Sequence, residues 1–285
     1  MTRLVFFGSS EYSLIILKKI LELTNFSLSL VIAKIDKPFD RNQTITPNPV
    51  AKFTKDNHLP LLQIEKFNDN CKLIIDNCRA TLGLCVAFGP PFFDEETIDI
   101  FPYKIVNIHP SPLPKYRGAT PGPWQIINGE TTSAVTFFQI DPLPDHGPII
   151  ASIPFSISPA ETASSFYQKA FLLAADHLDS VLSSYIQNPK SLTPQNHSQK
   201  TYFPKLSKDR ALIDWSWTPA KIDRFVRGLT PWPIAWTLAT NHNSESLKMK
   251  IFSYNLKKDE PQNVQIEGKK PTFWSEIKTH YSIIK

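Results

Sequence analysis

The order of apolar and polar positions along this chain changes once, near residue 131. Before it, short apolar runs typical of buried strands alternate with apolar residues at helical spacing. The expected strands are 3–8, 28–36, 59–64, 80–89 and 104–109, and the expected helices between them are 11–23, 50–58 and 72–78. Strands that alternate with helices in this way predict an α/β fold whose parallel sheet carries helices on both faces.

After residue 131, two strand patterns follow each other with no helix between them. They cover 133–141 and 148–157, which predicts an antiparallel addition to the sheet. The loop that joins them, 141–147, is acidic and contains two prolines. A long amphipathic pattern over 162–186 predicts a helix with Thr162 as its N-cap.

The last third of the chain has a different pattern. Residues 187–200 are polar and contain two prolines, which predicts a linker. The segments beyond it predict a small β-domain built from a helix at 218–229 and strands at 234–240, 247–256 and 264–268. We therefore expect an α/β catalytic domain at 1–188, a linker at 189–205 and a β-domain at 206–285.

The apolar runs and the cysteines indicate in which cellular compartment the protein is expected. With 41% hydrophobic residues the chain can bury a core, yet no apolar run approaches the ~20 residues of a membrane span. The first apolar run is too short for a secretory signal and fits a strand better. Cys71, Cys78 and Cys85 form no C-x-x-C pair, so neither a disulfide framework nor a metal site is expected. These features favour a cytoplasmic protein with no membrane partner.

The excess positive charge lies in the C-terminal part of the chain. There are 31 Lys and Arg against 26 Asp and Glu, and residues 206–285 hold 13 of the basic and 8 of the acidic residues. The first 205 residues are therefore neutral. A basic domain joined to a neutral one favours a polyanionic partner such as nucleic acid, with a solvated basic surface as the alternative.

Unusual residues occur at three predicted strand ends. Gly8-Ser9-Ser10, Phe88-Gly89-Pro90 and the stretch Asn107–His109 each end or follow an apolar run. The carboxyl ends of parallel strands share one edge of the sheet, and ligands of open α/β sheets bind there. We therefore expect these residues to lie along one edge.

Asn107 and His109 are the chemically informative pair. Two residues apart on a strand, their side chains share one face. An amide N–H is a neutral donor, and an imidazole can both donate and transfer a proton near neutral pH, so the pair suits an oxygen that becomes negative. A carboxylate to orient the imidazole could be Asp141 or Asp145, and the tight turn implied by the following His-Gly favours Asp145.

Several common mechanisms lack their residues in this sequence. There is no G-x-S-x-G, no H-E-x-x-H, no G-x-G-x-x-G after the first strand and no Walker lysine, and Cys85 lies inside an apolar run. An amide, an imidazole and a carboxylate without nucleophile or metal fit direct transfer of an acyl group between two bound molecules. The alternative is that His109 is only a hydrogen-bonded histidine at a strand end and Asn107 a turn-capping amide.

Two longer stretches resemble a known family. "NIHPSPLPKYRGATP" (107–121) and "VTFFQIDPLPDHG" (135–147) resemble the N-x-H-x-S-x-L-P, R-G and D-x-G signature of the folate-dependent formyltransferases. "KLSKDRALIDW" (205–215) and "PWPIAW" (231–236) are similar to the segment leading into the C-terminal domain of the methionyl-tRNA formyltransferases. The resemblance covers roughly residues 3–255.

The resemblance implies a fold, two substrates and a set of roles. It implies a Rossmann-like domain that holds 10-formyltetrahydrofolate and a small OB-like β-barrel, here shortened, that helps hold initiator tRNA charged with methionine. By the same resemblance Asn107 donates to the formyl oxygen, and His109 stabilises the oxyanion and assists proton transfer to the leaving folate nitrogen. Asp145 pairs with His109 and helps to take the proton from the attacking amine. No metal is expected, and the chain is expected to be a monomer.

The binding residues carried over from the family fall into two sets. Those expected at the folate are Ala87, Phe88, Gly89, Ser111, Leu113, Pro114, Asp141, His146 and Gly147. Those expected at the tRNA are Lys37, Arg41, Lys208, Arg210, Arg224, Arg227, Lys248, Lys250, Lys257 and Lys258. Trp232 and Trp236 are expected in a core at the domain junction rather than as base-stacking platforms.

The sequence allows more than one acceptor for the formyl group. The stretch "IDKPFDRNQTITPNPVAK" (35–52) has fewer basic residues than the family's loop that reaches the acceptor stem. The alternatives are an N-formyltransferase acting on a nucleotide-linked amino sugar, a formyltetrahydrofolate deformylase with water as acceptor, and a nucleic-acid-binding module without activity. The basic C-terminal part speaks against the sugar, and Asn107, His109 and Asp145 speak against an inactive module.

Overall fold

The computed structural model describes residues 1–38, 45–89 and 93–284. The chain divides into two compact units. The first unit comprises residues 1–117, 134–155 and 168–202, and the second comprises 118–133, 156–167 and 203–285. The second unit therefore takes two short segments from the part of the chain expected to form the α/β domain, and the expected boundaries at 188 and 205 remain a prediction.

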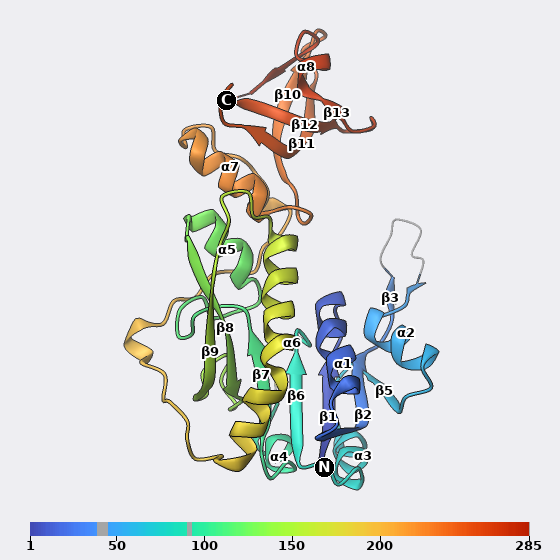
Figure 1. Ribbon diagram of the computed structural model, residues 1–285. Coiled ribbons are helices and arrows are strands. Elements are labelled where there is room, and N and C mark those ends of the chain that lie inside the picture. Colours follow the sequence, from blue (N-terminus) through green and yellow to red (C-terminus); the bar gives the residue numbers. More distant parts are fainter. Residues whose placement is uncertain (39–44, 90–92, 285) are drawn as a thin grey trace. The chain divides into compact units, whose positions relative to one another are not determined.

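The first unit is built on a seven-stranded sheet with the order β5-β2-β1-β6-β7-β8-β9 (Figure 1). The strands are β1 (Thr2–Gly8), β2 (Phe26–Lys34), β5 (Leu61–Ile64), β6 (Leu82–Val86), β7 (Ile105–His109), β8 (Thr132–Gln139) and β9 (Ile149–Ser156). The first five are parallel to their neighbours, and β8 runs antiparallel to β7. The predicted parallel sheet with an antiparallel addition is thus confirmed.

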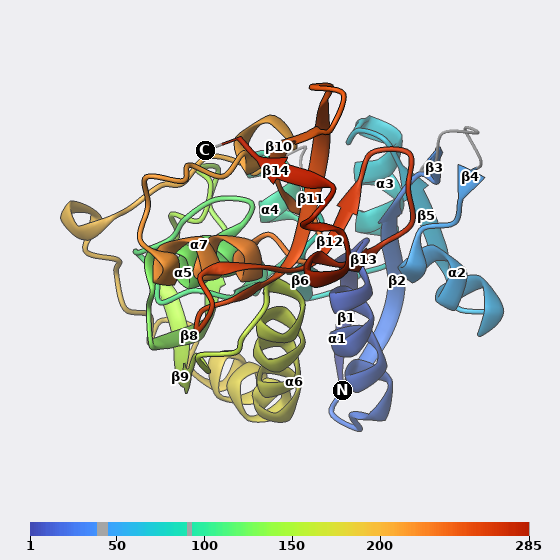
Figure 2. The same ribbon diagram turned by 90° about the horizontal axis from the view of Figure 1, so that it is seen from above.

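Helices cover both faces of this sheet. They are α1 (Glu11–Glu22), α2 (Pro49–Asp56), α3 (Asp69–Asn77), α4 (Glu95–Asp99) and α6 (Ala163–Gln187). Figure 2 shows α3 and α4 on one face and α1 with most of α6 on the other. A short β3 (Lys37–Pro38) pairs with β4 (Ile45–Thr46) between β2 and α2.

A cluster of aromatic rings fills the α3 and α4 side of the sheet. Phe7 on β1 is fully buried and makes edge contacts with the rings of Phe88, Phe93 and Phe101. Apolar residues from β2, β6 and α3 complete this core. The three cysteines are free thiols, as the sequence predicted. This core also packs against the end of β6, because Phe88 lies two residues beyond it.

The second unit contains a five-stranded antiparallel sheet with the order β13-β12-β11-β10-β14. Its elements are α5 (Pro121–Asn128), α7 (Pro219–Gly228), β10 (Ala235–Asn241), β11 (Ser246–Asn255), β12 (Glu260–Ile266), β13 (Thr272–Phe273), α8 (Trp274–Ile277) and β14 (Tyr281–Ile283). The predicted β-domain is confirmed. In the described residues β13 and β14 are edge strands, so the sheet is curled but not closed into a barrel.

Short elements were missed by the sequence prediction. Helix α5 begins at Pro121 and has Pro123 in its first turn, where the absent backbone N–H groups cost no helical hydrogen bond. No helix or strand was predicted for this stretch. The helices α4 and α8 and the last two strands span only two to five residues each, too few for a periodic pattern.

Candidate active site

Three parallel strands deliver their carboxyl ends to one edge of the sheet, as predicted. Gly8 on β1 pairs with Val86 on β6, and Cys85 pairs with Asn107 on β7. The turn after β1 is tied to this edge, because the hydroxyl of Ser13 donates to the carbonyl of Val86 at 2.6 Å. Gly8 is required there, since a Cβ would lie 2.6 Å from the ring of Phe6.

His109 ends β7 and is only 6% exposed. Its Nε2 lies 3.0 Å from the carbonyl oxygen of Tyr116, an acceptor, so Nε2 must carry the proton. Its Nδ1 lies 3.6 Å from Oδ1 of Asp145. The fixed Nε2–H leaves Nδ1 with a free lone pair in the neutral ring, and that lone pair lies beside the carboxylate.

Asp145 reaches His109 from the loop between β8 and β9. Its backbone has φ of 49°, in the left-handed region that non-glycine residues seldom adopt. Such strain is concentrated at functional sites, where surrounding contacts must maintain it. The next-but-one residue is Gly147, at which a Cβ would lie 1.9 Å from the carbonyl oxygen of Gln139. Only glycine lets the loop pass this close to β8.

Asn107 lies two residues before His109 on β7, so both side chains leave the same face of the strand. It is half-buried, and its backbone pairs with Cys85 on one side and Phe138 on the other. Buried neighbouring strands on both sides fix the strand, and therefore the origin of the amide side chain.

The loop after β7 is locked by internal hydrogen bonds. Ser111 is fully buried, its hydroxyl donates to the carbonyl of Lys115 at 2.8 Å, and its carbonyl accepts from Thr136 at 2.6 Å. Leu113 is buried and Pro114 half-buried. Tyr116 has φ of 58°, a second left-handed residue beside the site. The hydroxyl of Ser111 is thus engaged in shaping the loop, and the loop in turn places the Tyr116 carbonyl against His109.

Two histidines and a carboxylate lie beside Asp145. His146 contacts Asp141 with 2.5 Å between Nδ1 and Oδ2. The ring of His146 stacks on the ring of His197, with centroids 4.0 Å apart and an interplanar angle of 2°. Burial lowers the pKa of His197, and the nearby His146, Arg117 and Lys200 lower it further. Asp141 is therefore paired with His146, whereas His109 is paired with Asp145, as the sequence favoured.

The end of β6 presents backbone rather than side-chain chemistry. Ala87 has φ of 44° and is exposed, Phe88 is buried, and Gly89 has φ of 73° with open space where a Cβ would be. Two left-handed residues separated by Phe88 bend the backbone sharply at this strand end. Pro90 lies outside the described residues. Burial raises the pKa of the Cys85 thiol to about 12, so Cys85 stays protonated and is no nucleophile.

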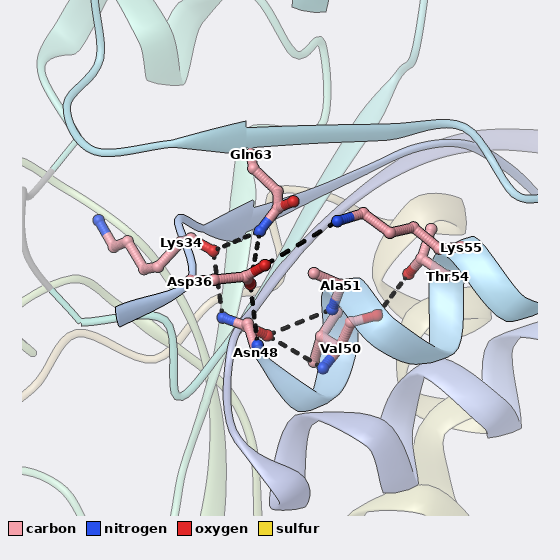
Figure 3. Close-up of polar contacts among 8 residues, drawn as sticks. All are labelled: Lys34, Asp36, Asn48, Val50, Ala51, Thr54, Lys55 and Gln63. Atoms are coloured by element: carbon pink, nitrogen blue, oxygen red, sulfur yellow. Dashed lines mark hydrogen bonds and ion pairs between the residues drawn. The ribbon is translucent and has the colours of Figure 1, made fainter. Parts of the chain in front are cut away.

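Lys37 and Arg41 lie between Asp36 and Asn48 in the sequence. Asp36 and Asn48 belong to one cluster of polar contacts (Figure 3). Asp36 accepts from the backbone N–H of Asn48 at 2.9 Å and from Nε2 of Gln63 at 2.9 Å, and these bonds lower the pKa of Asp36. Asn48 also accepts from the first turn of α2 and donates to the carbonyl of Lys34. Lys37 belongs to β3, and Arg41 lies outside the described residues, so neither side chain is placed.

The basic residues of the second unit divide into outward and inward ones. Met249 and Ile251 on β11 are buried, so the alternating Lys248 and Lys250 face the other way. Lys248 lies 3.8 Å from the ring centroid of Trp236, which is paired with Lys250 across the sheet. The indole N–H of Trp236 donates to the carbonyl of the exposed Lys208 at 2.7 Å. We call Lys208, Trp236, Lys248 and Lys250 the β10–β11 patch.

Other basic residues have different surroundings. Arg210, Lys257 and Lys258 are exposed, the two lysines in the turn between β11 and β12. Arg224 donates to the carbonyl of Ile127 at 3.3 Å. Arg227 is paired with Asp223 at 2.8 Å and donates to the carbonyl of Glu161 at 2.7 Å. The two arginines are engaged inside the fold, and we leave them out of the proposed tRNA surface.

The two tryptophans expected in a core lie at its margin. The side chain of Trp232 is 51% exposed, and Trp236 is half-buried in the β10–β11 patch. The core of the second unit is instead formed by aliphatic residues of α7, β10, β11 and β12 with Phe225 and Trp274. The expectation for Trp232 is therefore wrong.

Two family models match this chain. The Formyl transferase family matches residues 2–182, and the family Formyl transferase, C-terminal domain matches residues 205–281. The chain therefore belongs to the formyltransferase family, a family of folate-dependent enzymes.

The similar proteins include methionyl-tRNA formyltransferases and other N-formyltransferases. The chain is 31% identical over 256 residues to a methionyl-tRNA formyltransferase of Streptococcus equi subsp. equi, covering 90% of this chain and 80% of the relative. It is 32% identical over 262 residues to one of Acetivibrio thermocellus, covering 92% and 82%. Among solved structures, a 4-N formyltransferase from Francisella tularensis superposes with a TM-score of 0.65 at 18% identity, covering 89% of this chain and 98% of that one. An N-formyltransferase from Helicobacter canadensis, in complex with folinic acid and dTDP-3-aminofucose, gives 0.63 at 21%, covering 89% and 96%.

Two structural features are absent from the described part of the chain. Within residues 1–38, 45–89 and 93–284, no helix is long and apolar enough to cross a membrane. Within the same ranges, no three His, Cys, Asp or Glu side chains are grouped as metal ligands would be.

Sequence reasoning missed the residues that support the site: Tyr116, Gln195, His197 and Thr201. Tyr116 contacts His109 through its backbone carbonyl, and the other three residues lie in the predicted linker. Neither kind of contact has a recognisable sequence motif.

Proposed function

We propose that this chain transfers the formyl group of 10-formyltetrahydrofolate to the amino group of methionyl-tRNA. The observation that carries the proposal is the pair of His109 and Asp145, with 3.6 Å between Nδ1 and Oδ1 and with Nε2 committed to a backbone carbonyl. Two relatives named methionyl-tRNA formyltransferase support the acceptor, because they match across 90% and 92% of this chain.

The half-buried Asn107 provides the neutral donor. A tetrahedral intermediate places negative charge on the formyl oxygen, and a donor held on a rigid strand stabilises that charge without reorganising. Asn107 lies on β7 between two paired strands, on the face from which His109 also leaves. The two side chains can therefore act on the same small group. Asn107 donates a hydrogen bond to its oxygen, and His109 takes part in the proton transfers.

The geometry of His109 and Asp145 supports a route for the proton. With the Nε2 proton fixed, a neutral Nδ1 and an ionised carboxylate are two acceptors facing each other, and a single proton between them relieves their repulsion. When the neutral amine attacks, the new C–N bond forms and the nitrogen loses a proton to this pair. When the bond from carbon to the folate nitrogen breaks, the pair returns that proton to the leaving nitrogen. The proton count is balanced without a metal or a covalent enzyme intermediate.

The folate is expected against the carboxyl edge of the sheet. The exposed, left-handed Ala87 and Gly89 suit backbone recognition of a pteridine ring, and the buried Phe88 and Leu113 supply apolar surroundings. His146 and Gly147 lie in the loop that carries Asp145. For the tRNA, the β10–β11 patch combines three cations with an aromatic face, the combination that phosphates and unstacked bases favour.

A direct assay tests the proposal. The protein is incubated with 10-formyltetrahydrofolate and methionyl-initiator tRNA, and formylmethionine is quantified after deacylation. We expect formylation that depends on enzyme and folate, and no formylation of uncharged tRNA, which lacks the amine. Absence of formylmethionine, with the folate demonstrably bound, would reject the acceptor.

A nucleotide-linked amino sugar is the second candidate, supported by the N-formyltransferase from Helicobacter canadensis, which shares the fold and was solved with dTDP-3-aminofucose. The two acceptors differ in how binding depends on salt. A polyanion held by several lysines binds with an affinity that falls steeply as salt rises. For a small acceptor with two phosphates, the logarithm of the binding constant should fall with the logarithm of the salt concentration with a slope no steeper than about −2. Titrations of tRNA and of a dTDP-amino sugar over a salt series therefore separate them.

A further inference from the structure

The segment 193–202, part of the predicted linker, is hydrogen-bonded to the loop that carries Asp145 and to the loop that follows His109. Thr193 exchanges backbone hydrogen bonds with Ile149 at the start of β9. At the other end, the hydroxyl of Tyr202 donates to the carbonyl of Pro144 at 3.0 Å. Between these two points the chain passes beside Asp145 on one side and Tyr116 on the other.

We infer that Gln195, held by Arg117, is a positioning residue that keeps the carboxylate of Asp145 beside the ring of His109. The inference rests on the proposed function, because it assigns work to the same pair of residues. It concerns a side chain outside the signature motifs, in a segment for which the sequence predicted only a connecting role.

Every polar atom of the Gln195 side chain is in use, although the residue is only 5% exposed. Nε2 donates to the carbonyl of Gly147 at 2.7 Å and to that of Asp145 at 3.1 Å. Oε1 accepts from Nη2 of Arg117 at 2.6 Å. An amide has two donor hydrogens and one acceptor oxygen, so the arrangement satisfies all of them and fixes the amide orientation. A buried polar group so fully paired is costly to disturb.

The carbonyl groups that Gln195 holds belong to the strained part of the loop. Asp145 has φ of 49°, a left-handed conformation that a non-glycine residue keeps only where contacts enforce it. Without the amide of Gln195 the two carbonyls lose their donors, and the backbone is free to relax to negative φ. That rotation redirects the Cα–Cβ bond of Asp145, and with it the carboxylate.

Arg117 connects this interaction to His109. It is 3% exposed and directly follows Tyr116, whose carbonyl accepts from Nε2 of His109. The backbone N–H of Arg117 donates to the carbonyl of Thr201 at 3.0 Å, and the N–H of Tyr116 donates to the hydroxyl of Thr201 at 2.8 Å. The same ten-residue stretch thus sets the tautomer of His109 and, through Arg117 and Gln195, the position of Asp145.

The main test compares Gln195→Met with Gln199→Met, which changes an exposed glutamine four residues further along. Methionine keeps the length and apolar packing of glutamine and removes the three hydrogen bonds. We expect Gln195→Met to lower kcat about 10- to 100-fold with KM for folate and acceptor within about threefold, as for a misplaced catalytic group. Gln199→Met should match the wild type. A raised KM with unchanged kcat, or an equal loss in both variants, would overturn the inference.

A double-mutant cycle distinguishes positioning from general support. If Gln195 acts through Asp145, Gln195→Met in an Asp145→Asn background should cost little further turnover. Losses that multiply would mean that Gln195 acts elsewhere and would reject the inference. Gln195→Glu provides a second variant that can still pair with Arg117 while losing both donors to the loop, so we expect a similar loss of kcat with a retained fold.

A structural readout keeps the inference separate from the acceptor. Should the wild type fail to formylate methionyl-tRNA, the proposed function fails, and crystal structures of the wild type and Gln195→Met still decide the positioning role. We expect the Nδ1–Oδ1 separation of His109 and Asp145 to exceed roughly 4 Å, the limit of an ion pair, only in the variant. An unchanged separation would reject the role of Gln195 whatever the acceptor is.

Discussion

The polar side chains around the His109–Asp145 pair are buried, whereas the lysines of the β10–β11 patch lie at the surface. His109, Arg117 and Gln195 are 6%, 3% and 5% exposed, and each has at least two polar partners. Lys208 and Lys250 are exposed, and Lys248 is held only over an aromatic ring. The first region contains three left-handed non-glycine residues, Ala87, Tyr116 and Asp145, at its edge.

The difference fits the sizes of the two proposed substrates. A formyl group is two heavy atoms, and its transfer depends on sub-ångström placement, which buried hydrogen bonds and strained backbone can enforce. A tRNA is a large polyanion whose binding is the sum of many weak, screened interactions, for which exposed lysines suffice. Single substitutions should therefore act strongly in the first region and weakly in the second, and on different kinetic quantities.

The largest effect is expected at His109. His109→Asn removes the proton-transferring ring at the end of β7 and should lower kcat about 1,000-fold, within the range for loss of a general acid–base. Folate affinity, measured by isothermal titration calorimetry, should change little, because the proposed folate-binding residues Ala87–Gly89 are unchanged. His242→Asn, at an exposed histidine of the second unit, is the matched control and should keep full activity. Turnover within tenfold of the wild type in His109→Asn would remove this histidine from the chemistry.

The β10–β11 patch should respond in binding rather than in chemistry. Lys248→Glu with Lys250→Glu should weaken tRNA binding about 10- to 100-fold at low salt and reduce the salt slope by about 2, one for each phosphate that is no longer neutralised. Turnover at saturating tRNA should stay near that of the wild type. The charge-matched control reverses the exposed Lys66 and Lys190 of the first unit and should leave both quantities unchanged. Equal weakening in both double variants would mean that only net charge matters.

A third substitution separates inward from outward basic residues. Arg227 is paired with Asp223 and donates to the Glu161 carbonyl, and its side chain is 17% exposed. Arg227→Gln should lower the free energy of unfolding by about 1–3 kcal/mol, as for the loss of charged hydrogen bonds, and leave the salt slope of tRNA binding unchanged. Thermal unfolding and the salt titration measure the two quantities. A reduced salt slope with unchanged stability would return Arg227 to the tRNA surface.

The same contrast explains which features could be predicted from the sequence. The sheet was predictable because burial imposes apolar runs, and every strand from β1 to β12 longer than two residues overlaps a predicted segment. The contact between His109 and Asp145 was predictable because His109 ends such a run and Asp145 lies in the loop that joins the next two. Helix α5 was not, since Pro121 and Pro123 are compatible with a first helical turn as well as with a loop.

The supporting residues could not be predicted for a different reason. Gln195 lies in a polar stretch with prolines, a composition that describes a solvated linker equally well. Its role depends on carbonyl groups, which every residue has and no sequence pattern marks. Likewise the inward turn of Arg224 and Arg227 depends on which side of α7 packs against α5, so composition alone placed them with the exposed lysines.

The smallest effect is expected at His197, which borders the active-site loop but is exposed. Desolvation by the surrounding residues lowers the pKa of His197 below the ordinary 6.5. The positive charges of His146, Arg117 and Lys200 lower it further, and the carboxylate of Asp141 raises it. The unfolded chain therefore takes up the proton at a higher pH than the native one. Stability should be unaffected above about pH 7 and should decrease as the pH falls through 6.5 toward the native pKa, since the unfolded state then binds more protons.

His197→Asn removes this titration, so its melting temperature should fall less than that of the wild type between about pH 7.5 and 5.5, measured by calorimetry in buffers of constant ionic strength. His242→Asn should retain the wild-type decrease. Activity provides the connection to the first region, because His197 contacts Arg117 through Nδ1 at 2.8 Å and Arg117 holds Gln195. If Arg117 is fixed mainly by Gln195 and Thr201, His197→Asn should change kcat by less than about threefold, a residue at the margin of a network being worth less than one at its centre. A loss as large as that of Gln195→Met would instead show that the buried network extends to the surface, and the contrast between fixed and exposed side chains would no longer divide along the two regions.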